Sequence, residues 1–273
     1  MYDFYFGELN EILENEESYL LFLKRMLPRW TNSIPDSEYL DIFEILNKID
    51  TRSKKPVLVE TGVGASSLVM SYFAIKNKGI LYSWDINGSK SAFLRGVVND
   101  TICKSFNKPL HKHWIFIAYS STDKYLGIPI LKEKGEKVDF CFLDSLHTLD
   151  NITAELRALI PVFNDTAYIS IDDANYTVRH TNFSIINLFR KKLGLKPAED
   201  IPDNRCREYY LEITDFLKKN FKSVELLDNP HKTSYQKDIY FLYYKSDKKV
   251  MDDVGMEKLN NLEHRFAAWK VKK

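Results

Sequence analysis

The stretch VLVETGVGASSLVMS (57–71) places an acid and two glycines between an apolar run and a helical run. Gly62 can adopt a positive φ angle, and Gly64 lets the backbone come close to a ligand. The amide groups at the start of the following helix point at the same place. Glu60, just before the glycines, would repel a pyrophosphate but attract a ligand that carries a sulfonium and an amino group. This turn is therefore a candidate binding site for a small cationic molecule.

A second acid, Asp85, closes the next apolar run, ILYSWD (80–85). A carboxylate at that place can accept hydrogen bonds from both hydroxyl groups of a ribose. The alternative is an acid that caps a helix or stabilises a turn. The order of strand, glycine turn, helix and strand favours the ribose interpretation.

Two further strands are expected to end in acids. KVDFCFLDSLHTLDNITAEL (137–156) contains a buried run that ends at Asp144, and AYISIDDAN (167–175) ends at Asp172 and Asp173. Adjacent strands of a parallel sheet end at the same edge, so these carboxylates should be neighbours, where they repel one another unless they are solvated, protonated or bound to a cation. Such a group suits Mg²⁺, Mn²⁺ or Ca²⁺. The alternative is one acid that holds an amino group of the ligand and two acids that cap the next helix.

Two histidines follow these acids closely in the chain. His147 comes three residues after Asp144, and His180 comes seven residues after Asp173. Either imidazole could take the proton from a reacting hydroxyl group. Either could instead be structural and donate a hydrogen bond to a carbonyl group.

The elements that must position these residues alternate between strand and helix. Short apolar runs separated by helices predict βαβ units and a parallel sheet with both faces covered. An antiparallel pair, 221–229 with 238–246, is expected to close one edge of the sheet. The expected parallel strands are 57–61, 80–85, 114–120, 138–144 and 167–172, and the expected helices between them are 66–76, 89–106, 122–134 and 149–161.

Two helical flanks are expected around this core, which divides the chain into 1–52, 53–246 and 247–273. The N-terminal flank contains an amphipathic helix that ends near Pro28 and a second helix over 36–49, capped by Ser33 or Asp36. This flank carries no recognisable chemistry and is expected to pad one end of the core. The C-terminal tail has apolar residues at helical spacing, which favours a helix that docks on the body or on a second copy of the chain. The tail could therefore be an element of a homodimer.

Composition limits the partners. The chain has 39 Lys and Arg against 38 Asp and Glu, a net charge of +1, which argues against a broad basic face for nucleic acid or anionic lipid. There is no run of eighteen apolar residues and no basic and apolar leader at the N-terminus, so we expect no membrane span and no secretory signal. The three cysteines are widely spaced, as in a reduced, cytoplasmic protein.

The pattern E-x-G-x-G after the first strand, with an acid at the end of the second, resembles class I S-adenosylmethionine-dependent methyltransferases over about 54–245. The resemblance implies an α/β, Rossmann-like, doubly wound seven-stranded sheet of order 3-2-1-4-5-7-6 with the last strand antiparallel. It implies S-adenosyl-L-methionine lying over the strand ends, with WIFIAYSSTD (114–123) beside the adenine. The residues that this assigns to the cofactor are Glu60, Thr61, Gly62, Gly64, Ser66, Ser67, Asp85, Ser120, Ser121 and Asp144.

The detail of LDSLHT followed by AEL is similar to the cephalosporin hydroxylase/rhamnosyl O-methyltransferase family and, more loosely, to bacterial small-molecule O-methyltransferases. In those relatives the acid of this motif and the acid pair after strand five bind a divalent metal. The resemblance therefore implies that Asp144, Asp172 and Asp173 are ligands of Mg²⁺ or another divalent cation. The DDAN form also resembles the D-N pair of catechol-type enzymes, so Asn175 stays an alternative ligand.

The predicted function is S-adenosylmethionine-dependent O-methylation of a small polar acceptor such as a sugar or a natural-product precursor, with help from a metal. Asp144, His147 and His180 are the candidate catalytic residues. The segment 194–212, with Arg205, Arg207 and a Tyr pair, either covers the acceptor or is an ordinary surface loop. The alternative functions are a metal-independent methyltransferase acting on nitrogen or a phosphate oxygen, an NAD(P)-dependent oxidoreductase, and a binding protein that has lost turnover. Ser67 in place of a third glycine, together with Glu60, argues against the oxidoreductase.

Overall fold

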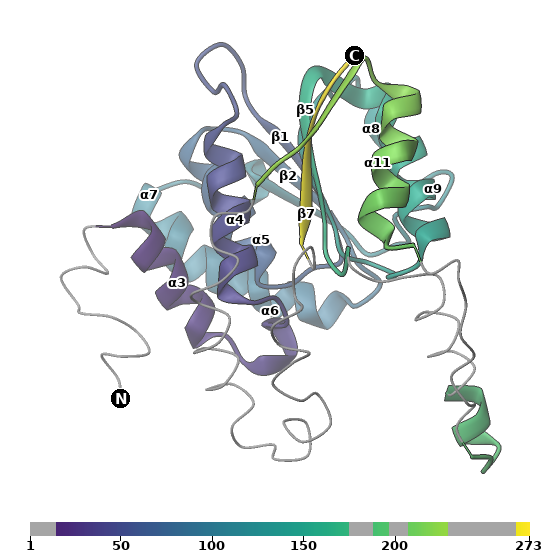
Figure 1. The fold of residues 1–273 in the computed structure, drawn as a ribbon. Coiled ribbons are helices and arrows are strands. Elements are labelled where there is room, and N and C mark those ends of the chain that lie inside the picture. The colour runs from purple at the N-terminus through teal and green to yellow at the C-terminus, as the bar shows by residue number, and fades with distance from the viewer. Residues whose placement is uncertain (1–14, 175–187, 197–206, 229–265) are drawn as a thin grey trace.

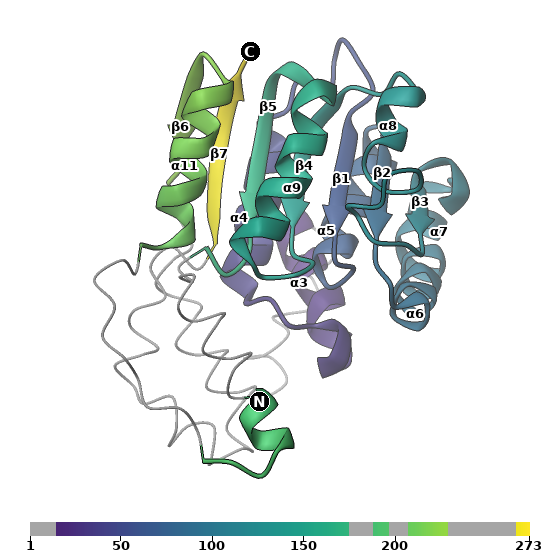
Figure 2. The same ribbon diagram turned by 90° about the vertical axis from the view of Figure 1, so that its right-hand side faces the viewer.

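A computed structural model of the chain describes residues 15–174, 188–196, 207–228 and 266–273. Its centre is a seven-stranded sheet of order β3-β2-β1-β4-β5-β7-β6 (Figures 1 and 2). The sheet has the predicted order. The strands are β1 (Val57–Thr61), β2 (Ile80–Trp84), β3 (Trp114–Ile117), β4 (Val138–Leu143), β5 (Phe163–Ile171), β6 (Ser223–Leu226) and β7 (Ala267–Lys272).

The register of the five parallel strands aligns the ends that matter for the site. Thr61 at the end of β1 pairs with Trp84 of β2 and with Leu143 of β4, and Leu143 pairs with Ile171 of β5. The residues that follow these strands therefore share one edge of the sheet. This confirms the expectation that the glycine turn and the acids lie together.

The strand at the antiparallel edge differs from the prediction. β7 pairs antiparallel with both β5 and β6, and it is formed by Ala267–Lys272, where the sequence predicted a helical tail. The expectation of helix over these residues was wrong, because Trp269 and Val271 pack on one face of the sheet while Ala268 packs on the other, which is the period of a strand. The predicted strand 238–246 lies outside the described residues.

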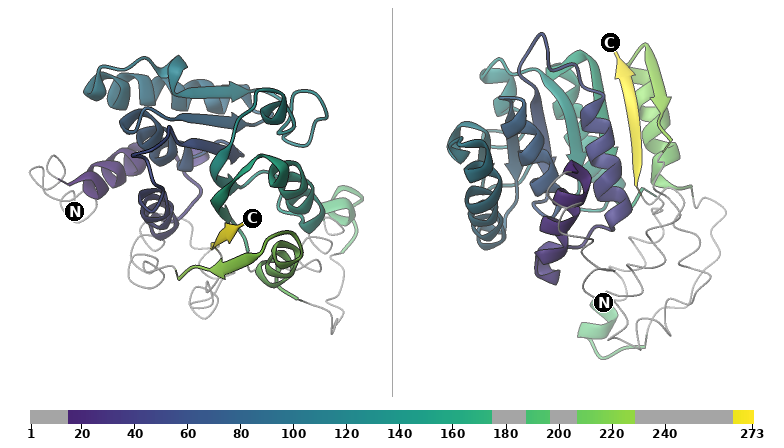
Figure 3. Two further views of the ribbon diagram at one scale, coloured as in Figure 1. Left: turned by 90° about the horizontal axis from the view of Figure 1, so that it is seen from above. Right: turned by 90° about the vertical axis from the view of Figure 1, so that its left-hand side faces the viewer.

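Helices cover both faces of the sheet. On one face lie α3 (Glu16–Met26), α4 (Asp36–Asn47), α5 (Ser66–Lys76) and α6 (Gly88–Val98), shown in purple and blue in Figure 3, and on the other lie α8 (Ile130–Glu133), α9 (Leu149–Leu159) and α11 (Tyr209–Asn220). α6 continues through a π-helical turn, Asn99–Cys103, into α7 (Lys104–Phe106). Short 3₁₀ turns cover Arg29–Thr31, Leu110–Lys112 and Ile160–Val162.

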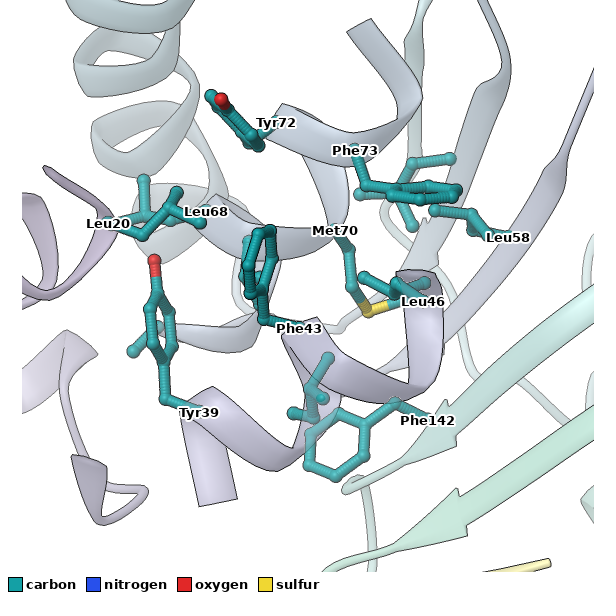
Figure 4. Packing of buried hydrophobic residues seen from close by; sticks show 14 of the residues in the cluster. Leu20, Tyr39, Phe43, Leu46, Leu58, Leu68, Met70, Tyr72, Phe73 and Phe142 are labelled. Atoms are coloured by element: carbon teal, nitrogen blue, oxygen red, sulfur yellow. The ribbon is translucent and has the colours of Figure 1, made fainter. Parts of the chain in front are cut away.

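The helices of the N-terminal flank, α3 and α4, pack on the core. In Figure 4, Leu20 of α3 and Tyr39, Phe43 and Leu46 of α4 pack around side chains of α5. Because α5 is covered by α3 and α4 as well as by the sheet, it is apolar on all sides, with every residue from Ser66 to Ile75 buried.

A buried ion pair network fixes α3 against α4. Asp36 accepts from Lys24 Nζ at 2.7 Å and from Arg25 Nε at 2.8 Å. Asp36 was predicted as a cap for α4, but the cap position is taken by Pro35 without a side-chain hydrogen bond. The carboxylate serves the two cations instead, since a buried lysine needs a partner of opposite charge.

The segment between β3 and β4 is less helical than predicted. A helix was expected over 122–134, but α8 spans only Ile130–Glu133. The Asp123 carboxylate accepts the backbone N–H groups of Tyr125 and Leu126, which makes a turn, and Pro129 stands directly before the short helix. Within the described ranges, no helix has the length and apolar character needed to cross a membrane.

Candidate active site

Gly62 forms the turn that brings β1 and β4 together. Its φ angle is +83°, and a Cβ atom there would stand 1.9 Å from the carbonyl oxygen of Asp144. The Gly62 N–H donates to the carbonyl of Trp84 at 2.8 Å, and the Asp144 N–H donates to the carbonyl of Thr61 at 2.8 Å. The predicted need for glycine is confirmed, but the close neighbour is the protein's own backbone at the end of β4.

Glu60 does not face the cavity, contrary to the expectation that it contacts the ligand. Its side chain is 0% exposed and accepts hydrogen bonds from Ser66 Oγ at 2.6 Å, Ser67 Oγ at 2.7 Å and Ser83 Oγ at 2.9 Å. The carboxylate thus joins the start of α5 to β2 beneath the turn. Burial raises the pKa of Glu60 to about 7, against the three hydroxyl donors and the charge of Lys90, which lower it.

The raised pKa makes a testable contribution to stability. Between the ordinary value of 4.5 and about 7, the folded state holds a proton that the unfolded state has lost. The free energy of unfolding should therefore fall as pH rises through this window, by roughly 3 kcal/mol more in the wild type than in Glu60→Gln. Urea unfolding at a series of pH values measures this difference. Glu133→Gln, at an exposed acid on α8, should follow the wild type; parallel curves for Glu60→Gln and the wild type would contradict the account.

A cavity of about 470 Å³ opens over the ends of the parallel strands. Six of the predicted residues line it: Gly62, Asp85, Ser120, Ser121, Asp144 and His147. The other predicted residues that the structure describes, Thr61, Gly64, Ser66, Ser67, Asp172 and Asp173 among them, do not line it. Its volume lies in the range of small-molecule sites.

Asp85 lies at the cavity wall and also holds the glycine turn. Its Oδ2 accepts the Val63 N–H at 2.9 Å, and its Oδ1 accepts the Asn87 N–H at 2.7 Å. Each carboxylate oxygen has a second lone pair, so these bonds leave acceptor capacity for a ligand hydroxyl. The turn and ribose interpretations of Asp85 are therefore compatible.

Three exposed apolar side chains line the cavity, and two of them, Ile86 and Leu146, were not predicted from the sequence. Ile86, Tyr119 and Leu146 line it and are 84%, 50% and 59% exposed. Exposed apolar groups around a pocket suit a flat heterocyclic ring. The one signal for them is position, since Ile86 follows Asp85 and Tyr119 precedes Ser120.

A second buried carboxylate, Glu155 of α9, lies below the cavity. It accepts from the hydroxyl groups of Ser121, Ser145 at 2.7 Å and Thr61 at 3.3 Å, which belong to three different strand-end segments. Burial raises its pKa, and the hydroxyl donors oppose this. Ser121 therefore serves the floor of the cavity through Glu155, and any contact between Ser121 and a ligand stays a prediction.

Acids and one histidine gather where β4 and β5 end. Asp144, His147 and Asp172 each offer a ligand atom, and these atoms lie within 4.8 Å of one another. His147 Nε2 is 3.5 Å from Asp144 Oδ1, and His147 Nδ1 is 3.2 Å from Asp173 Oδ2. Asp173 has a φ angle of +51°, and its N–H donates to Asp172 Oδ1 at 2.7 Å. The structure thus adds His147 to the predicted group and places Asp173 against the imidazole.

The group carries unfavourable negative charge. Burial raises the pKa of Asp144 well above its ordinary range, and the charges of Asp172 and Asp173 raise it further, while Lys90 lowers it. Glu38 of α4, which is buried, adds to the same effect. The N-terminal flank therefore takes part in the electrostatics of the site, although the sequence showed no chemistry there. A divalent cation would offset this repulsion.

The donor set fits such a cation. The two carboxylates suit Mg²⁺ or Mn²⁺, and the imidazole favours a transition metal over Mg²⁺. A ligating histidine commonly donates its second ring N–H to a carboxylate, and Asp173 lies where it could accept that proton. The candidate base His180 and the alternative ligand Asn175 lie outside the described residues.

The segment 194–212 is described only in part. Arg207 forms ion pairs with Glu212 at 3.4 Å and Asp215 at 2.7 Å, and Tyr209 is 1% exposed at the start of α11. These residues do not line the cavity. Arg205 lies outside the described residues, so the role of this segment stays a prediction.

The comparison with protein families decides the class. Residues 59–174, which contain the glycine turn, Asp85, Asp144, Asp172 and Asp173, match the model of a family described as a methyltransferase domain. These residues form an S-adenosylmethionine-dependent methyltransferase domain with the Rossmann-like sheet order. No curated protein sequence matches this methyltransferase.

Two solved structures are similar to this chain, and the one with the TM-score above 0.5 shares its fold. The O-methyltransferase from Bacillus cereus in complex with S-adenosylhomocysteine is 11% identical, with 94% of this chain and 90% of that chain covered and a TM-score of 0.51. Magnesium protoporphyrin IX methyltransferase from Synechocystis PCC 6803, with bound S-adenosylhomocysteine, is 10% identical over 87% and 83% of the two chains, with a TM-score of 0.43.

Proposed function

We propose that this methyltransferase acts on a hydroxyl oxygen of a small polar molecule, such as a sugar or a natural-product precursor, with a divalent cation bound by Asp144, His147 and Asp172. The observation that carries the proposal is the placement of this group. Its ligand atoms lie within 4.8 Å of one another, and Asp144 and His147 line the same cavity as Gly62 and Asp85. Donor and acceptor sites therefore meet at one edge of the sheet.

In this proposal, one end of the cavity binds the methyl donor and the other end binds the acceptor. Asp85 holds the ribose hydroxyls of the methyl donor, and the apolar side chains of Ile86 and Tyr119 lie beside its adenine. S-adenosylmethionine supplies a methyl group on a sulfonium, and transfer to oxygen is an in-line displacement that depends on alignment. Asp144 and Asp172 supply the negative charge that this cationic donor and a metal ion both favour.

At the acceptor end, His147 has a defined orientation. His147 Nδ1–H donates a hydrogen bond to Asp173 Oδ2, which leaves Nε2 as the ligand atom beside Asp144. A bound divalent cation would lower the pKa of the acceptor hydroxyl and fix its oxygen. With Nε2 on the cation and a proton on Nδ1, His147 has no free lone pair, so His180 is the candidate base in this arrangement. His147 is the candidate base in the metal-independent alternative.

Replacing Asp85 tests the ribose assignment. Asp85→Ala should weaken S-adenosylhomocysteine binding about ten- to hundredfold, because charge-assisted hydrogen bonds to two hydroxyls are lost. Isothermal titration calorimetry measures the change. Asp123→Ala is the matched control, because Asp123 also holds two backbone N–H groups of a turn and does not line the cavity. Unchanged affinity in Asp85→Ala would refute the ribose role.

The chemistry itself is tested with a panel of sugars, catechols and other small hydroxyl compounds. We expect methyl transfer from S-adenosylmethionine to at least one of them, lost when the protein is treated with a chelator and restored by Mg²⁺ or Mn²⁺. Transfer to amines or phosphates that is insensitive to chelation would instead support the metal-independent alternative. Cofactor binding without transfer to any acceptor would support a binding protein.

For the cellular setting we propose a cytoplasmic protein with a small-molecule acceptor and without nucleic-acid or membrane partners. The charge balance and the free, buried thiols of Cys103 and Cys141 support this proposal. A homodimer stays a prediction, which sedimentation of the purified protein tests.

A further inference from the structure

Lys90 lies in the first turn of α6, at the end of β2. Its backbone N–H donates to Asn87 Oδ1 at 3.2 Å, and the Asn87 N–H donates in turn to Asp85 Oδ1. This cap fixes the first turn of α6 next to the acid at the cavity wall. The partly buried side chain of Lys90 lines the cavity.

The ammonium group of Lys90 points toward the glycine turn. Its Nζ is 3.8 Å from the place where a Cβ atom on Gly64 would stand, and its charge acts on both Glu60 and Asp144. Among the described residues, it makes no hydrogen bond or ion pair. A partly buried ammonium without a partner in a cavity wall has lost hydration and gained no bond in return, which favours an anionic ligand group there.

The methyl donor carries both positive and negative groups, and the cavity offers a group of opposite charge for each. S-adenosylmethionine carries a sulfonium and an ammonium, which suit the acids near Asp144, and one carboxylate, which those acids would repel. Lys90 is the one lysine or arginine among the described residues that line the cavity. It lies on the side of Gly64 and the start of α5, where the helix dipole also favours negative charge.

We propose that Lys90 binds the carboxylate of the methionine moiety of S-adenosylmethionine and so sets the direction in which the donor lies between Asp85 and the acids. This inference rests on the methyltransferase function, and it is independent of the metal ion. It assigns to α6 a binding role for the donor. The competing role for Lys90 is to neutralise the acids near Asp144 without touching the donor.

The experiment compares two ligands on three proteins in the presence of a chelator. S-adenosylhomocysteine carries the carboxylate, and its decarboxylated analogue lacks only that group. We expect Lys90→Met to weaken S-adenosylhomocysteine about ten- to hundredfold and to change the affinity for the analogue by less than about threefold. Lys90→Arg should recover most of the affinity. Lys104→Met, at an exposed lysine of α7, is the control and should bind both ligands as the wild type does.

Two results would overturn this inference and leave the methyltransferase function standing. One is an equal loss of affinity for both ligands in Lys90→Met, which means that Lys90 supports the cavity. The other is an equal gain for both, which means that the lysine only neutralises the acids. If the wild type binds neither ligand, the inference and the methyltransferase function fail together.

Discussion

Gly62→Ala should lower the free energy of unfolding by about 3–5 kcal/mol. The residue sits at φ +83°, which costs a side-chain-bearing residue about 1–2 kcal/mol, and its new Cβ would stand 1.9 Å from the Asp144 carbonyl oxygen. Backbone cannot rotate away as a flexible side chain does, so β1 and β4 would have to separate at the end where the site lies. Urea unfolding of the wild type and the variant measures the effect.

Gly64→Ala is the matched control for this prediction. A Cβ atom at Gly64 would have its nearest neighbours, Lys90 Nζ and the Thr31 carbonyl oxygen, at 3.8 Å, which is ordinary contact. Stability should therefore change by less than about 1 kcal/mol. If the two variants unfold alike, the close approach of the β1 turn to β4 does not explain the glycine. Loss of S-adenosylhomocysteine affinity in Gly64→Ala with stability kept would support the predicted contact between this turn and the ligand.

Asp144→Ala should lower methyl transfer at least about a thousandfold and leave S-adenosylhomocysteine affinity within a few-fold. Asp144 is the acid that faces both His147 and the cavity, so its loss removes one of the three grouped ligand side chains and the charge beside the reacting centre. Stopped-time assays with radiolabelled donor, together with calorimetry, separate the two effects.

The controls for Asp144→Ala exclude a folding defect. The variant should be as stable as the wild type or more stable, because the burial and the charges of Asp172 and Asp173 that raise the Asp144 pKa no longer act on a carboxyl group. Asp150→Ala, at an exposed acid of α9, should keep full activity. A large loss of donor affinity in Asp144→Ala would mean that this acid serves the methyl donor and not the acceptor.

The parallel part of the site could be predicted from the sequence because its geometry follows from one rule. Strands of a parallel sheet end at a common edge, so Gly62, Asp85 and Asp144 had to be neighbours once their strands were recognised. The same rule placed Asp172 beside Asp144. No knowledge of side-chain conformation was needed for these residues.

The direction of a side chain could not be predicted in the same way. Glu60 fits the pattern of an acid before the glycine turn. Its carboxylate nevertheless lies beneath the turn, where it accepts hydrogen bonds from Ser66, Ser67 and Ser83. Two of these serines were expected to bind the ligand instead. Lys90 gave no signal, since a lysine in the first turn of a helix is ordinary on a protein surface.

The C-terminal strand shows a second limit of prediction from the sequence, because the spacing of its apolar residues does not distinguish a helix from a strand. Phe266 and Trp269 are spaced as in a helix, yet Trp269 is buried in β7, between β5 and β6, and Phe266 is buried just before this strand. A run of only six residues, Ala267–Lys272, fits either period, and pairing with strands distant in the sequence decides between them.

Binding of Mn²⁺, followed by electron paramagnetic resonance, tests whether Asp144, His147 and Asp172 form a metal site. We expect one Mn²⁺ per chain in the wild type, with the affinity reduced at least about tenfold in Asp172→Asn and in His147→Gln and unchanged in Asp150→Asn. Full methyl transfer by a protein that binds no Mn²⁺ and ignores chelators would contradict the account.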